Sequence, residues 1–74
     1  MKKKTFHIGE YCLHETVEVI LKGVELTVKF FNFKTRDLQE EETFHFVDKF
    51  KMRMYLEDRM SSYYADKVMD EFYV

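Results

Sequence analysis

The stretch from residue 15 to residue 33, ETVEVILKGVELTVKFFNF, decides the fold. Apart from Ile20, apolar and polar residues alternate on both sides of Lys22-Gly23, which is the period-two pattern of half-buried strands. Glycine adopts the positive φ of a tight turn without steric cost. We therefore predict a β-hairpin closed by Lys22-Gly23 as a two-residue turn.

The register of this hairpin follows from the position of the turn. With Lys22-Gly23 at the tip, three apolar pairs lie opposite each other on one face: Leu21 and Val24, Val19 and Leu26, Val17 and Val28. A slip of one residue would turn all of these side chains into the solvent, so the alternation strongly specifies the pairing. We expect this face to form the core.

The opposite face of the hairpin is mostly polar near the turn, but Phe31 and Phe33 lie on it farther along the second strand. Two explanations stay open for these rings. Either a loop or helix of the same chain covers them, or they belong to a surface for a partner, because monomers rarely expose a large apolar patch.

Two further strands are expected beside the hairpin. Residues 5–11 are typical of a strand, and residues 1–4 are expected to be a frayed basic tail. Another strand ends with residues 43–46, and the acidic run at residues 40–42 suits an exposed edge because charge discourages edge-to-edge aggregation. These segments complete a four-stranded antiparallel meander.

The C-terminal segment has a helical pattern without glycine or proline, and Asp48 suits the N-cap position. Its apolar stripe changes direction, however, by nearly half a turn. The first stripe comprises Met52, Leu56 and Met60, and the second comprises Ala65, Val68, Met69 and Phe72. One straight helix cannot bury both stripes on one sheet, so we predict helices over residues 48–60 and 62–73 with a bend at Ser61-Ser62. A single long helix that contacts two partners is the alternative.

The sequence thus predicts one small α+β domain over residues 1–74, with the helical segment packed on one face of a four-stranded antiparallel sheet. A chain of this length buries only about 60% of its unfolded surface, so its core is marginal. Cys12 is the only cysteine and cannot form an intramolecular disulfide. Eight phenylalanines and five tyrosines offer dense packing or association instead.

Charge and hydropathy indicate a cytoplasmic protein. The net charge of −2 requires neither a nucleic-acid nor a membrane partner. No apolar stretch approaches the length of a membrane span, and none follows the basic start as in a signal peptide. An unpaired cysteine without an export signal fits a reducing compartment.

The residues capable of chemistry form no specific motif. Cys12 and His14, with His7 and His45 elsewhere in the chain, fall short of zinc-binding spacing, and only Cys12 offers a thiolate. A cysteine with a nearby histidine is a minimal nucleophile and base, but the pattern is unspecific. We expect no metal, no cofactor and no catalytic activity.

These observations favour a non-catalytic protein-interaction module that associates with itself, as a symmetric homodimer, or with another protein. Aromatic residues are enriched at the centres of interfaces. The expected contact residues are Phe31, Phe33, Tyr63, Phe72 and Tyr73.

The alternative is a nucleic-acid-binding accessory protein. Aromatic side chains on a sheet can stack with bases, and nearby cations can contact phosphates. The rings would be those of Tyr11, Phe31 and Phe33, and the N-terminal cations those of residues 2–4.

Overall fold

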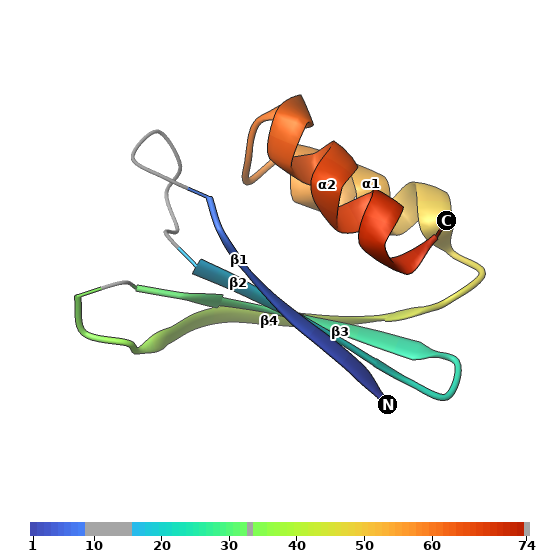
Figure 1. Cartoon of the computed structure of the whole chain (residues 1–74), viewed down its shortest axis with the longest axis horizontal. Helices are drawn as coiled ribbons and strands as arrows, with labels where there is room; N and C mark the ends of the chain where they lie inside the picture. Colours follow the sequence, from blue (N-terminus) through green and yellow to red (C-terminus); the bar gives the residue numbers. More distant parts are fainter. Residues whose placement is uncertain (9–15, 33, 74) are drawn as a thin grey trace.

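The computed structural model describes residues 1–8, 16–32 and 34–73. Within these ranges the elements are β1 (Lys2–His7), β2 (Thr16–Lys22), β3 (Glu25–Phe31), β4 (Leu38–His45), α1 (Lys49–Glu57) and α2 (Ser62–Phe72). The strands form one antiparallel sheet in the order β1-β2-β3-β4, and both helices lie on the same face of it (Figure 1). The predicted α+β fold, a four-stranded meander followed by helices, is confirmed.

The predicted register of the central hairpin is wrong by two residues. Lys22 pairs with Glu25, so the turn residues are Gly23 and Val24 rather than Lys22 and Gly23. Gly23 has φ of +62°, whereas Val24 does not have a positive φ. A positive φ at only the first central position matches a type II′ turn, which prefers glycine there.

The shift of two residues leaves the predicted faces intact, because side chains repeat every two residues along a strand. Leu21 lies opposite Leu26, and Val19 lies opposite Val28. Val17 lies opposite Phe30, whose large ring is fully buried. Val24 is left in the turn, where more than half of its side chain is exposed. Hydrophobic alternation therefore identified the buried face but could not distinguish two registers of equal parity.

The expectation of a frayed basic tail at residues 1–4 is also wrong for Lys2–Lys4. These residues begin β1 and pair with Val19–Leu21 of β2. Lysines are favoured on an edge strand because their charge prevents pairing with other chains. Lys3 lies 3.5 Å from the Glu18 carboxylate, and the Lys2 ammonium donates to the backbone carbonyl of Glu71. The predicted strand over residues 5–11 thus starts earlier, at Lys2, and β1 ends at His7; residues 9–11 of the predicted strand lie outside the described residues.

The core lies between the sheet and the helices. The predicted face of Val17, Val19, Leu26 and Val28 is fully buried there. The helices contribute both predicted apolar stripes to the same core: Met52, Leu56, Met60, Ala65, Val68, Met69 and Phe72.

The predicted break between the helices is confirmed. α1 ends at Glu57, α2 begins at Ser62, and α2 returns alongside α1 over the sheet (Figure 1). Asp48 and Ser61 occupy the N-cap positions, although neither side chain makes a capping hydrogen bond. Within the described ranges, no helix has the length and apolar character needed to cross a membrane.

Candidate functional site

Of the five aromatic residues expected at a partner contact, the four that the structure describes do not all lie together. Phe31 is half-buried and lines a pocket of about 340 Å³ with His7, Thr16, Asn32 and Arg36. Phe33 lies outside the described residues. Thr16 and Phe31 have the opposite parity to the buried residues of β2 and β3, so this pocket is on the sheet face away from the helices.

The other three belong to the helical layer. Tyr63, in the first turn of α2, is 62% exposed and packs edge-on against Tyr64 with ring centroids 5.2 Å apart. Phe72 is only 6% exposed and packs in the core, so we leave it out of the candidate contact surface. Tyr73 follows α2 and is half-buried.

Tyr73 belongs to a largely apolar concave surface of the helical layer, which we call the helical groove. The groove has a volume of about 480 Å³ and lies between the start of α1 and the end of α2. Its apolar lining consists of Val47, Phe50, Met69 and Tyr73. Its charged side chains are Lys49 and Arg53 on α1 and Asp70 on α2.

The groove is unusual because two of its apolar lining residues, Val47 and Phe50, face water. Val47 is 76% exposed and Phe50 is 75% exposed. Met54, one helical turn after Phe50, is 55% exposed and extends the apolar surface along α1. Three adjacent, largely exposed apolar side chains beside a groove are typical of a surface that another molecule covers.

One end of the groove is held rigidly by Tyr73. Its ring stacks on Phe46 with centroids 4.5 Å apart and an interplanar angle of 14°. Its hydroxyl donates a 2.8 Å hydrogen bond to the carbonyl oxygen of Phe46. Burial raises the pKa of Tyr73, and the nearby Asp48 carboxylate raises it further. The Lys49 ammonium lies 5.5 Å from the centroid of the same ring.

The charges around the groove are only partly compensated. Arg53 donates a 2.6 Å hydrogen bond to Glu57 and also pairs with Asp66, so it ties α1 to α2. The Glu57 contact is the main cause that raises the pKa of Arg53. Within the part of the chain that the structure describes, neither Lys49 nor Asp70 forms an ion pair. Lys49 on α1 and Asp70 on α2 thus carry opposite charges without an ion-pair partner among the described residues, and the Lys49 ammonium contacts the Tyr73 ring.

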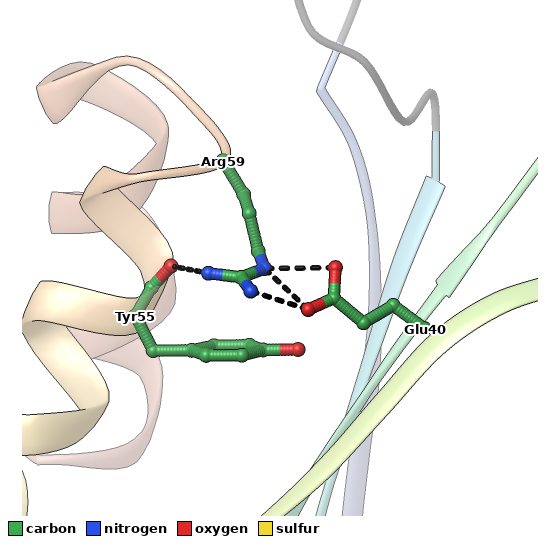
Figure 2. Close-up of polar contacts among 3 residues, drawn as sticks. All are labelled: Glu40, Tyr55 and Arg59. Carbon is green, nitrogen blue, oxygen red and sulfur yellow. Dashed lines mark hydrogen bonds and ion pairs between the residues drawn. The ribbon is translucent and has the colours of Figure 1, made fainter.

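A second polar cluster joins the helices to the sheet edge (Figure 2). Arg59, just after α1, donates to both carboxylate oxygens of Glu40 on β4, with distances of 2.8 and 2.9 Å from its Nε. Its Nη1 donates to the backbone carbonyl of Tyr55, and the guanidinium carbon lies 3.6 Å from the centroid of the Tyr55 ring. Charge-assisted bidentate pairs are among the stronger hydrogen bonds in proteins. This cluster fixes the end of α1 on the sheet and so helps to orient the groove.

The Tyr55 hydroxyl is the unusual group of this cluster. It is buried and lies beside the Glu40 carboxylate (Figure 2), but it makes no hydrogen bond of regular geometry with any described residue. Burial raises the pKa of Tyr55 to about 12, and the interaction of its hydroxyl with the adjacent Glu40 carboxylate, which favours the protonated phenol, adds to the shift. Hydrogen bonding to Glu40 is the main cause that raises the pKa of Arg59. A protonated phenol and a permanent guanidinium give this cluster a structural role.

The sheet face away from the helices is largely polar and internally paired. Lys29 lies 3.7 Å from Glu41, and the hydroxyls of Thr27 and Thr43 are 3.1 Å apart. Cys12 and His14, considered above as metal ligands, lie outside the described residues. No group of three potential metal-binding side chains occurs within residues 1–8, 16–32 and 34–73.

Sequence reasoning missed Val47, Phe50 and Met54 as candidate contact residues, although the signal for two of them was present. A helix that ends before Ser61 and buries Met52 and Leu56 must direct Phe50 and Met54 elsewhere. The pairing of Arg59 with Glu40 has no comparable signal, because it depends on how α1 lies across β4.

Comparisons with protein-family models, curated proteins and solved structures give no match for this chain. The roles of its residues are therefore argued from their own geometry and chemistry.

Proposed function

We propose that this chain is a small, non-catalytic protein-interaction module that acts in the cytoplasm and binds a protein through the helical groove. The observation that supports this proposal is the exposure of Val47 and Phe50, each about three-quarters exposed beside a groove of about 480 Å³. Exposed apolar side chains cost solvation free energy, which a partner recovers by covering them. A ring that projects next to a concave apolar surface is also typical of an interface centre.

The charged residues add specificity to this surface. Lys49 and Asp70 lie beside the apolar lining and have no ion-pair partners among the described residues, so they can select a partner with complementary charges. Tyr73 supports the groove from within, through its stack and hydrogen bond with Phe46.

Nucleic-acid binding has less support. Two of the N-terminal lysines contact acidic residues, Lys2 with Glu71 and Lys3 with Glu18. Lys29, beside the sheet aromatics, contacts Glu41. A phosphate backbone would have to compete with these carboxylates, and the carboxylates would repel it.

The proposal is tested by comparing proteins captured from the native cell by the wild type, by Phe50→Asp and by Leu38→Asp, followed by binding measurements with purified components. Leu38 is a matched control because it is apolar, about half-exposed and located on β4 rather than at the groove. We expect Phe50→Asp to lose binding and Leu38→Asp to retain it. Equal binding by both variants would contradict the groove as the contact surface.

A further inference from the structure

We infer that the occupant of the helical groove is a second copy of this chain, arranged about a two-fold axis that runs along the groove. This inference rests on the proposed function and names its partner. In such a dimer, α1 of each copy lies over α2 of the other, and the two sheets form the outer layers.

The distribution of charge favours this axis. Lys49, whose positive charge has no ion-pair partner among the described residues, is carried by α1, and Asp70, whose negative charge likewise has none, is carried by α2. The Lys49 side chain already extends across the groove, with its ammonium 5.5 Å from the centroid of the Tyr73 ring. A two-fold rotation about the groove direction places the α1 side of one copy opposite the α2 side of the other. Lys49 then faces Asp70 of the second copy, and symmetry generates the same pair again. A two-fold axis across the groove would instead bring like charges together.

The shape of the surface is also self-complementary. Phe50 projects from α1 with 75% of its surface exposed, and the groove beside it has a volume within the range of sites that accept apolar groups. In the proposed dimer, Phe50 of each copy packs over the groove of the other, between its α1 and α2. One surface of the chain thus supplies both the projecting ring and the groove that receives it.

The charges on the two edge strands, β1 and β4, oppose a symmetric dimer formed by edge-to-edge strand pairing. Pairing β1 with β1 would bring Lys2–Lys4 of both copies together, and pairing β4 with β4 would bring Glu40–Glu42 together. Like charges across neighbouring strands are destabilising, so neither edge forms a two-fold interface. Pairing of a basic β1 with an acidic β4 is electrostatically allowed, but it leaves a free edge at each end and produces open chains.

The first experiment is sedimentation equilibrium of the full chain from micromolar to millimolar concentration. The wild type and Leu38→Asp are expected to form dimers, and Phe50→Asp is expected to remain a monomer. Asp is well suited to position 50 because an acidic residue is favourable in the first turn of α1, so the variant should stay folded by circular dichroism. A monomeric wild type at all concentrations, or a series of assemblies larger than a dimer, would overturn the inference.

The second experiment tests the axis by exchanging charges. Lys49→Asp and Asp70→Lys are each expected to raise the dissociation constant of the dimer about tenfold, because each creates two symmetric like-charge contacts. The double variant restores both pairs with reversed signs and should return to within a few-fold of the wild type. Failure of the double variant to recover would overturn this arrangement.

The experiments distinguish failure of the homodimer inference from failure of the proposed protein-binding function. A monomeric wild type that still binds a different protein, with loss of binding in Phe50→Asp, would refute the second copy as partner while supporting the groove. If Phe50→Asp still forms the dimer and still binds other proteins as the wild type does, both the groove as contact surface and the second copy as its occupant would be refuted.

Discussion

Two tyrosines offer a direct test of how the helical layer is held on the sheet. Both are partly buried, but their hydroxyls differ: that of Tyr73 donates to the Phe46 carbonyl at 2.8 Å, and that of Tyr55 makes no hydrogen bond of regular geometry with any described residue. Tyr73→Phe and Tyr55→Phe each remove a single oxygen and keep the ring. Tyr73→Phe retains the stack on Phe46, and Tyr55→Phe retains the contact with Arg59. The pair therefore compares a bonded with an unbonded hydroxyl in one domain.

The expected changes have opposite signs. Loss of the Tyr73 hydrogen bond should lower the free energy of unfolding by about 1 kcal/mol. Removal of the Tyr55 hydroxyl removes a buried polar group that lacks a regular hydrogen bond, and should leave that free energy unchanged or raise it by up to about 1 kcal/mol. A core of this size supplies roughly 3–5 kcal/mol, so either change is a large fraction of the total. For a domain of this length, about 1 kcal/mol corresponds to a shift of roughly 4–8 °C in melting temperature.

Thermal and urea unfolding, followed by far-ultraviolet circular dichroism at one fixed protein concentration, measure both differences. The concentration must be fixed because self-association would raise the apparent stability. If Tyr55→Phe destabilises the protein as much as Tyr73→Phe, the Tyr55 hydroxyl must be hydrogen-bonded after all, and the assignment of Tyr55 as the unbonded member would be refuted.

Three further outcomes follow from the polar contacts. Arg59→Met should lower the free energy of unfolding by roughly 1–3 kcal/mol because it removes the charge-assisted hydrogen bonds to the half-buried Glu40 carboxylate. Arg53→Met, at a solvent-screened pair, should cost less, and equal losses in urea unfolding would contradict this ranking. The raised pKa of Tyr55, about 12 in the folded protein against 10 when unfolded, means that its ionisation does not affect stability below pH 10 and lowers stability as the pH rises from 10 to about 12. Unfolding curves across this range should show this loss in the wild type and a smaller one in Tyr55→Phe. Fluorescence anisotropy with labelled single-stranded DNA and RNA should show no binding at low salt, whereas affinity that falls steeply with added salt would revive the nucleic-acid alternative.

The sequence was sufficient to predict the layers of the fold because hydrophobic periodicity reports directly on burial. The alternation around Val19 and Val28 identified the buried sheet face, and the change of stripe at Ser61 identified the helix break. The hairpin register was not predictable in the same way. A shift of two residues preserves every side-chain face, and only the preference of glycine for the first turn position distinguishes Gly23-Val24 from Lys22-Gly23.

The N-terminal strand shows a second limit of sequence patterns. Lys2–Lys4 have the composition of a disordered tail, yet they pair along β2 and thereby satisfy backbone groups that would otherwise form an open edge. Local composition cannot reveal this, because the cause is a neighbouring strand that requires a partner. The ion pair between Arg59 and Glu40 is likewise determined by the packing of α1 on the sheet.

The break between α1 and α2 has two consequences: it completes the core, and it leaves part of the apolar surface of α1 exposed. A straight continuation of α1 would keep Phe50 and Met54 on the side of Ala65, Val68 and Met69, where all could share one partner surface. The break before Ser62 lets α2 fold back and bury its own stripe on the sheet, whereas Phe50 and Met54 stay on the outer side of α1. Burial of both stripes in a chain of 74 residues therefore leaves part of the apolar surface of α1 uncovered. The core of this domain is small, so association that covers this surface would add apolar burial that the monomer lacks. We therefore expect binding at the groove to increase the stability of the fold.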